Sequence, residues 1–263
     1  MMASKNQQST QARAAAQAQA RAQLKAKERR TTVVIIAVSL LVIMGFAAVV
    51  FFIVDSSNTP PVADAHAPAV ADETGGIPVG TGGVAGKDVP SDVTRVDLYL
   101  DLMCPVCNGF EQTNSADVDA LREAGTIAVY YHPVSILNRF SQGTMYPTRA
   151  ANAVAVVAEK DPAHMLPFIT ALYANQPEEN STGLTDEQIA AIAVGVGVPA
   201  DVAAGMKNGE FSEWVVAATD RASQDGMSVT PTVMVNREVV DPEEINYFTP
   251  GTLKVYLEQV AAG

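Results

Sequence analysis

The stretch Asp101-Leu102-Met103-Cys104-Pro105-Val106-Cys107 decides the fold of this 263-residue chain, and it contains the only two cysteines. Cysteines that staple a small domain lie far apart in the sequence, whereas this pair closes almost no loop. A Cys-x-x-Cys pair suits reversible dithiol–disulfide chemistry, because the second thiol can release a mixed disulfide formed by the first. Two alternatives stay open: a chance pair of buried cysteines, and half of a zinc site that histidines would complete.

The residues around this motif predict a strand, a helix and a second strand. Val93 to Leu102 is rich in β-formers and alternates apolar and polar residues, which is typical of a strand. Pro105 fits the first position of a helix, which we expect to continue from Val106 to about Ala124. Thr126 to Tyr131 predicts the next strand, and His132-Pro133 would close it. Such a βαβ unit has parallel strands joined by a right-handed crossover.

The remainder of the chain predicts helices, a hairpin and a last helix. Residues from about Met145 to Ala222 have largely helical patterns. Ser228 to Val235 and Glu238 to Val240 predict two short strands joined by a turn at Asn236-Arg237. Thr252 to Ala261 predicts an amphipathic C-terminal helix. The predicted fold class is therefore α/β, with the element order βαβ, helices, ββα.

This order and two motifs resemble the thioredoxin superfamily, specifically its DsbA-like group with a helical insertion. The first motif is the Cys104–Cys107 stretch, and the second is Val229-Thr230-Pro231-Thr232. The resemblance implies a thioredoxin-like domain over residues 92–263, with the helical insertion at about 140–225. It also implies a cis peptide bond before Pro231, packed against the cysteines. Pro231 could instead open an ordinary edge strand.

Two positions depart from the pattern of this family. Many relatives carry a buried acid six residues before the first cysteine, where this chain has Leu98, and a tryptophan where it has Met103. Asp97 is expected to face the opposite side of the strand, so it is a poor substitute. Asp101 is the nearer candidate for a proton relay, or it merely caps the local backbone. We therefore expect the thiol chemistry to survive with an unusual redox potential.

The position of Cys104 predicts its chemical role. It directly precedes a helix, where free N–H groups and the helix dipole stabilise a thiolate. Cys104 is therefore expected to form the mixed disulfide with a substrate. Cys107, one turn further along, is expected to be more buried and to release trapped complexes. This chemistry requires no metal, nucleotide or flavin cofactor.

These residues predict a protein thiol–disulfide oxidoreductase that forms disulfides in exported proteins with free thiols. Thr230 and Pro231 would form the loop that binds the substrate. Two alternatives stay open: a disulfide isomerase or reductase with the same site, and a module that binds or delivers Cu(I) or Zn(II) through Cys104 and Cys107, with His132 nearby. The resemblance implies a quinone-linked membrane partner that reoxidises the enzyme.

The N-terminal part predicts a membrane anchor. Residues 31–54 contain no charged side chain, and a helix over 33–54 would rise about 33 Å, close to the hydrocarbon thickness of a bilayer. Seven basic residues and one acid precede this segment, so its N-terminal side is expected in the cytoplasm and the rest of the chain outside. Ala63-Asp64-Ala65 resembles a cleavage site, which leaves a signal peptide as the alternative.

Two segments flank the predicted anchor. Residues 1–30 are expected to form a basic, low-complexity cytoplasmic tail, and residues 55–91, rich in Pro, Gly, Ala and Asp, predict a flexible extracytoplasmic linker. From residue 55 onward the chain has 10 basic and 28 acidic side chains, a net charge of −18 within a chain total of −12. Such an acidic surface argues against binding nucleic acid or anionic lipid headgroups.

Overall fold

The structure is a computed structural model that describes Val62 and residues 64–263, all within one compact unit that begins at Thr59. The predicted tail at 1–30 and the predicted membrane span at 31–54 lie outside the described residues. Of the helices that the structure describes, none is both long enough and apolar enough to cross a bilayer.

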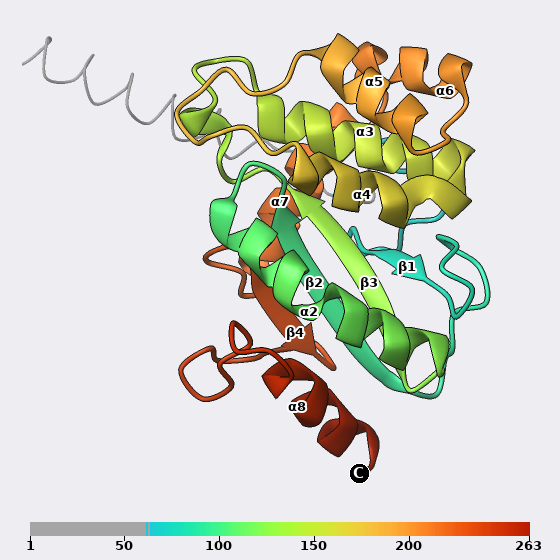
Figure 1. The fold of residues 1–263 in the computed structure, drawn as a ribbon, viewed down its shortest axis with the longest axis vertical. Coiled ribbons are helices and arrows are strands. Elements are labelled where there is room, and N and C mark those ends of the chain that lie inside the picture. The colour runs from blue at the N-terminus through green and yellow to red at the C-terminus, as the bar shows by residue number, and fades with distance from the viewer. Residues whose placement is uncertain (1–61, 63) are drawn as a thin grey trace, which may run out of the picture. The chain divides into compact units, whose positions relative to one another are not determined.

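A five-stranded sheet in the order β1-β3-β2-β4-β5 forms the centre of this unit (Figure 1). The strands are β1 (Ile77–Val79), β2 (Thr94–Asp101), β3 (Ile127–Val134), β4 (Thr232–Val235) and β5 (Glu238–Val239). β2 pairs with β3 in parallel and with β4 antiparallel. Helix α2 (Pro105–Glu123) joins the parallel pair, which confirms the predicted βαβ unit.

Side chains of β2 alternate between two cores on opposite faces of the sheet. Leu98 and Leu100 belong to the large core, together with Phe110 of α2. Tyr99 belongs to a smaller cluster with Ala222 of α7 (Ser212–Gln224). Because successive strand residues point to opposite faces, α2 and α7 cover opposite sides of the sheet. In Figure 1, α2 crosses in front of β2 and β3, and α7 lies behind them.

Helices separate β3 from β4, as the sequence predicts. They are α3 (Tyr146–Lys160), α4 (Met165–Ala174), α5 (Asp186–Gly195) and α6 (Ala200–Gly205), followed by α7. Every residue of α3 from Tyr146 to Ala158 except Arg149 is buried, so this helix forms the centre of the insertion. Figure 1 shows α3 to α6 at the end of the sheet where α2 begins, so the insertion borders the cysteine motif.

The chain ends with the predicted hairpin and helix. Asn236 and Arg237 between β4 and β5 have positive φ angles of 51° and 70°, as a tight two-residue hairpin turn requires. Helix α8 (Thr252–Ala261) follows, with Leu253 and Leu257 buried. It lies beside α2 on the same side of the sheet (Figure 1).

β3 is longer than predicted, because it continues through His132 and Pro133 to Val134 rather than ending at Tyr131. β1 pairs with β3 only at Val129–Tyr131. Beyond Tyr131, β3 no longer pairs with β1. The missing N–H of Pro133 therefore removes no hydrogen bond between these two strands.

Residues 64–91 contribute to the folded unit, although their composition predicts a linker over 55–91. Ile77 and Val79 are fully buried in β1, which pairs antiparallel with β3. Asp72 then ties this segment to β2 through an ion pair with Arg95 (2.8 Å). A short strand can add to the edge of an existing sheet and share its core, so few large apolar residues are needed.

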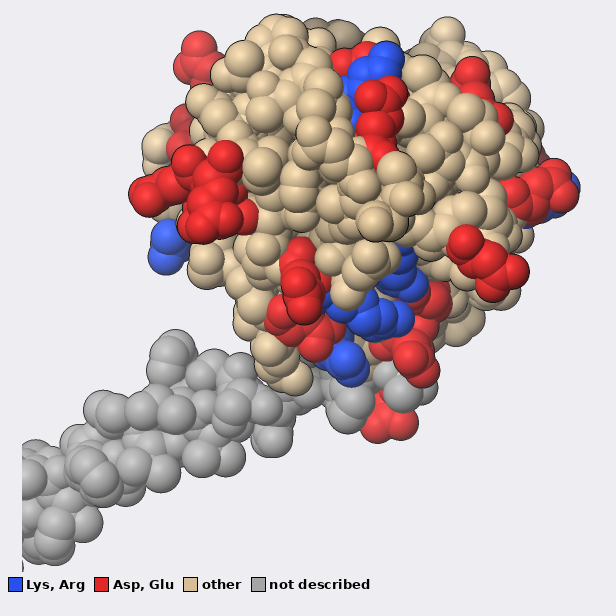
Figure 2. Space-filling view, turned by 90° about the horizontal axis from the view of Figure 1, so that it is seen from below, with Lys and Arg blue, Asp and Glu red and all other residues tan. Residues whose placement is uncertain are grey.

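The surface is acidic but not uniformly so. Figure 2 shows acidic side chains spread over the face seen from below, with Lys and Arg side chains next to acidic ones. Ion pairs such as Arg149–Asp186 and Arg221–Asp225 partly neutralise this charge. Exposed pairs of this kind contribute little stability each.

Candidate active site

Cys104 is the N-cap residue of α2. Its backbone is extended (φ −75°, ψ 116°), and Pro105 begins the helix without losing a hydrogen bond, since the first N–H groups of a helix have no partner within it. The N–H groups of Val106 and Cys107 are thereby free to interact with the Cys104 sulfur. Cys107 is completely buried, one turn into the helix.

The two thiols differ in their electrostatic environment. The pKa of Cys104 is lowered to about 6, mainly by a hydrogen bond that the Cys107 thiol donates to the Cys104 sulfur. The N–H groups of the first helical turn lower this pKa further, whereas burial acts to raise it. Burial raises the pKa of Cys107 far above its usual range, and the charge on Cys104 adds to this effect. Both thiols are free in the structure. At neutral pH the site therefore holds a thiolate at Cys104 and a protonated thiol at Cys107.

The second predicted motif lies directly against the first. The Thr230–Pro231 peptide bond is cis, and the Cys104 sulfur lies 3.4 Å from the carbonyl oxygen of Thr230, to which the protonated thiol can donate. β4 begins at Thr232 and lies between β2 and β5 in the sheet, so Pro231 does not open an edge strand. The structure thus brings Cys104, Cys107, Thr230 and Pro231 together as expected.

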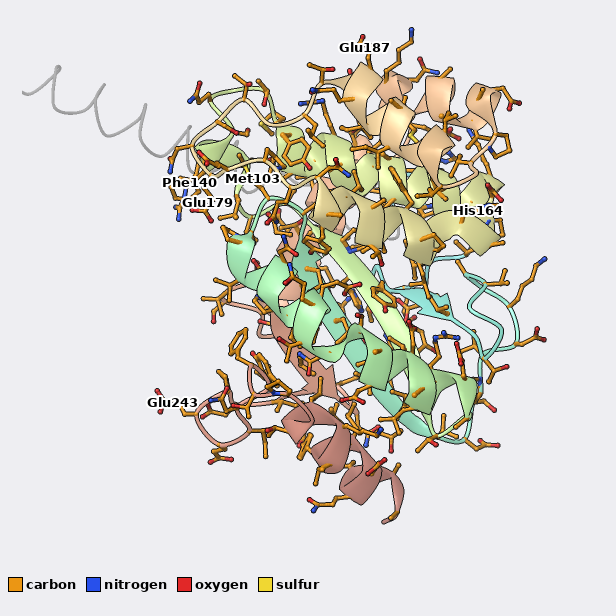
Figure 3. The ribbon with its side chains drawn as sticks, in the orientation of Figure 1. Met103, Phe140, His164, Glu179, Glu187 and Glu243 are labelled. Carbon is orange, nitrogen blue, oxygen red and sulfur yellow. The ribbon has the colours of Figure 1, made fainter. Side chains whose placement is uncertain are left out.

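Asp101 is completely buried at the end of β2. Its Oδ1 accepts the N–H of Met103 (2.8 Å) and its Oδ2 accepts the N–H of Leu137 (2.9 Å). The pKa of Asp101 is raised to about 7, mainly by burial and in part by the charges of Cys104 and Glu179, while the two N–H bonds oppose the shift. Figure 3 shows Met103 and Glu179 at the same end of the molecule, where α2 begins. Asp101 therefore caps the backbone and is also a titratable group close to Cys104.

Leu98 occupies the strand position where many relatives carry an acid, and it is buried in the apolar core. Asp97 faces the opposite side, as expected, and accepts hydrogen bonds from Arg95 Nε (2.8 Å) and His132 Nε2 (2.8 Å). Burial acts to raise the pKa of Asp97, but the bonds from His132 and Arg95 outweigh it and hold this pKa below its usual value.

His132 is bonded to Asp97 through its Nε2 (2.8 Å), and its ring stacks on Tyr99 with centroids 4.0 Å apart. Within residue 62 and residues 64–263, no three His, Cys, Asp or Glu side chains gather into a group that would hold a metal ion. The geometry therefore gives no support to the alternative of a metal-binding module.

Glu111 is a further buried acid near the site, and no motif in the sequence marks it. It lies in α2 four residues after Cys107, hence on the same face of the helix. Burial raises the pKa of Glu111 to about 7, the charge of Asp119 adds to this, and a long hydrogen bond from Thr170 (3.5 Å) opposes it. The spacing from Cys107 was visible in the sequence, but the burial of the carboxyl group was not.

The end of α4 contributes two more polar groups that the sequence does not reveal. The Tyr173 hydroxyl donates to the carbonyl oxygen of Asp101 (3.3 Å). Gln176 Nε2 donates to the carbonyl oxygens of Leu102 (3.1 Å) and Cys104 (3.0 Å). Both residues lie more than 65 positions from the cysteines along the chain, so only the tertiary fold brings them to the site.

A protein-family model described as thioredoxin matches residues 88–249, which is more than half of the chain. The chain belongs to the thioredoxin family. Among solved structures, this thioredoxin-family protein resembles MdbA, a thiol-disulfide oxidoreductase from Actinomyces oris, with 25% identity and a TM-score of 0.58 over 76% of this chain and 99% of MdbA.

Other relatives agree with this placement. The reduced DsbA of Mycobacterium tuberculosis is 23% identical with a TM-score of 0.54, over 71% of this chain and 99% of DsbA, a likeness that shows the fold alone. The family match and the likeness to MdbA support the assignment of this protein as a thiol–disulfide oxidoreductase. The serine/threonine-protein kinase PknE of M. tuberculosis is 31% identical over 120 residues, which is 44% of this chain but only 21% of the kinase.

Proposed function

We propose that this DsbA-like protein is a membrane-anchored oxidase that forms disulfides in proteins outside the cytoplasm. The observation that carries the proposal is the placement of the two thiols, with Cys104 at the N-terminus of α2 and Cys107 buried one turn later. This placement shifts their pKa values in opposite directions, downward at Cys104 and upward at Cys107. A stabilised Cys104 thiolate favours the reduced enzyme over its disulfide. The Cys104–Cys107 disulfide is therefore expected to be a strong oxidant.

The reaction begins with the oxidised pair. A substrate thiolate attacks Cys104 Sγ, so a substrate–Cys104 disulfide forms while the Cys104–Cys107 bond breaks. The electron pair leaves on the Cys107 sulfur, which takes up a proton because burial disfavours its thiolate. A second substrate thiolate then attacks the substrate sulfur, and Cys104 leaves as a stabilised thiolate. Two electrons and one proton thus pass to the enzyme, and the substrate gains a disulfide.

Asp101 is the proposed relay for the proton that Cys107 takes up. Its pKa of about 7 lets the carboxyl group exist in both protonation states near neutral pH. Asp101 also lies next to the active-site turn through its bond to Met103 (2.8 Å). No metal, nucleotide or flavin takes part in this scheme. We propose that a quinone-linked membrane partner restores the disulfide.

Exported chains that are still unfolded are the proposed substrates. The backbone of Thr230 lies beside the Cys104 sulfur, where an extended substrate segment can pair with it through main-chain hydrogen bonds. Val106 and Val229 are 51% and 60% exposed, so apolar substrate side chains can rest on them. Main-chain pairing of this kind requires little sequence specificity, as a general oxidase needs.

Oxidative refolding of a reduced, disulfide-containing protein by the oxidised enzyme tests the proposal. We expect the wild type to restore the client's disulfides, Cys104→Ser to restore none, and Cys107→Ala to accumulate mixed disulfides visible on non-reducing gels. The equilibrium with glutathione should give a potential nearer to about −120 mV than to about −270 mV. A value close to the latter would contradict the oxidase and favour a reductase.

The membrane anchor is proposed from the uncharged segment 31–54 and the basic residues that precede it. Protease added to cells with permeabilised outer layers should release an active soluble fragment and leave the basic tail protected. A mature chain that begins near His66 in untreated cells would instead show a cleaved signal peptide.

A further inference from the structure

We propose that Gln176 is a positioning residue through which the helical insertion holds the Cys104 turn and sets the reactivity of the Cys104 thiol. This inference rests on the proposed role of Cys104 as the attacking and leaving thiol. It adds a residue that lies 72 positions from Cys104 in the chain and that has no place in either sequence motif.

Both ends of the Gln176 amide form hydrogen bonds, the nitrogen with the turn and the oxygen with α2. Its Nε2 donates to the carbonyl oxygens of Leu102 (3.1 Å) and Cys104 (3.0 Å), and its Oε1 accepts from Asn108 Nδ2 (3.2 Å). Because the two carbonyl oxygens can only accept, the nitrogen end of the amide must face them. Asn108 also donates to the carbonyl oxygen of Tyr173 (3.1 Å), so its side chain links α2 to the end of α4 by hydrogen bonds.

These contacts fix the two carbonyl groups on either side of Met103, immediately before α2. The extended backbone of Cys104 (φ −75°, ψ 116°) places this residue at the N-terminus of α2, where the helix dipole favours a thiolate. The Cys104 carbonyl also accepts the first helical bond, from Asn108 N (3.2 Å), so it is held by both α2 and Gln176. Without the Gln176 donor, the turn loses its two hydrogen bonds from the insertion, and the Cys104 sulfur is held less firmly at the N-terminus of α2.

The β-sheet holds the other side of the turn, where the Asp101 carboxylate accepts the N–H of Met103 (2.8 Å) and the Asp101 carbonyl oxygen accepts the N–H of Cys104 (3.1 Å). From the insertion, Gln176 reaches the turn, and the Tyr173 hydroxyl donates to Asp101 O (3.3 Å). The insertion is therefore more than a cover for the end of the sheet. It contributes directly to the geometry that makes one thiol more acidic than the other.

Two substitutions separate the loss of hydrogen bonds from the addition of charge. Gln176→Met keeps the length of the side chain but cannot donate, and Gln176→Glu places acceptor oxygens and a negative charge against the two carbonyl groups. Asn175 provides matched controls, because this neighbouring exposed amide donates only within its own helix, to Ala171 O (2.9 Å). Asn175→Leu and Asn175→Asp make the same chemical changes one residue away.

The measurement is the pH profile of alkylation of Cys104 in the reduced full-length chain, read by mass spectrometry. At pH 6 we expect alkylation to be roughly threefold slower in Gln176→Met and roughly fivefold slower in Gln176→Glu, the latter being the loss of thiolate that a rise of one unit in a pKa of about 6 gives at this pH. The Asn175 variants should stay within about twofold of the wild type. Circular dichroism confirms that each variant is folded, and either Gln176 variant alone suffices if the other does not fold.

Unchanged profiles in the folded Gln176 variants, or equal shifts in the Asn175 variants, would overturn the proposal. Alkylation does not depend on the direction of disulfide exchange. A wild-type protein that fails to oxidise clients while its Gln176 variants still shift the profile would therefore contradict the proposed oxidase and leave the role of Gln176 intact.

Discussion

Single residues of the site differ in reactivity because of where they lie in one helix. Cys104 precedes the first turn, where N–H groups are free, whereas Cys107 lies on the buried face that packs against the sheet. The same burial acts on the carboxyl groups of Asp101 and Glu111, whose pKa values it raises to about 7. The site thus combines one acidic thiol with two carboxyl groups that hold their protons up to neutral pH.

Glu111→Gln is expected to stabilise the protein at pH 8 and to have little effect at pH 4. The folded state raises the pKa of Glu111 from 4.5 to about 7, so it binds this proton more tightly than the unfolded chain does. The protonated carboxyl group contributes its full stabilisation of the folded state below about pH 4.5. This contribution is lost as the pH rises through about 7. We expect a gain on the order of 1–3 kcal/mol at pH 8, measured by urea unfolding.

Glu258→Gln in α8 is the control for this substitution, because its side chain is exposed. It should leave the free energy of unfolding nearly unchanged at both pH values. If Glu111→Gln destabilised the protein at pH 8 and did so less at pH 4, Glu111 would instead be held by a specific partner in its charged form.

At the scale of elements, the segment before β2 is the part whose structure differs most from expectation. β1 covers the edge of β3, and the loop before it lies on His132. His132 has little freedom to move, because it is bonded to Asp97 and stacked on Tyr99. The composition of this segment predicts a linker. In the structure the segment instead packs against the face of the sheet that carries Asp97.

Gly76→Ala should therefore destabilise the protein. A Cβ atom at Gly76 would lie 2.7 Å from His132 Nε2 and 2.9 Å from its Cε1. Relief of such an overlap in a packed site is expected to lower the free energy of unfolding by about 1–3 kcal/mol. The matched control is Gly82→Ala in the same segment, where a Cβ meets no atom within 4 Å. Equal urea midpoints for the two variants would mean that the segment is not packed on the sheet.

At the scale of the whole molecule, the catalytic motifs, the sheet and the helical insertion depend on one another. β2 carries Asp101 to the site, α2 presents the cysteines, β4 follows the Thr230–Pro231 bond, and the end of α4 supports the turn. The thioredoxin family match begins only at residue 88, so the segment with β1 precedes it. This segment extends the folded unit beyond the residues that the family model matches.

A protein truncated to residues 62–263 is expected to fold and to retain thiol reactivity, whereas one truncated to 92–263 should unfold at a lower temperature. The shorter protein loses β1, which uncovers the edge of β3, and it loses Asp72, the partner of Arg95 (2.8 Å). Thermal unfolding followed by circular dichroism measures the difference. Equal midpoints would restore the interpretation of 64–91 as a linker.

The sequence by itself determined the features that depend on short spacings. The Cys-x-x-Cys pair before a proline-started helix, the βαβ unit, the hairpin at Asn236-Arg237 and the motif at Thr230-Pro231 could all be predicted, because propensity, periodicity and turn chemistry act over a few residues. These features were enough to identify the family and to predict the reactive thiols.

Only the tertiary structure decided which groups surround those thiols. Glu111 could not be identified as an acid of the site until its burial was known, and Gln176 meets Cys104 across 72 residues of chain. Asp72 likewise finds Arg95 only because β1 pairs with the edge of β3. Burial and contacts between distant segments are properties of the packed chain, since the dielectric environment and the partners of a side chain are fixed only when the core and its edges come together.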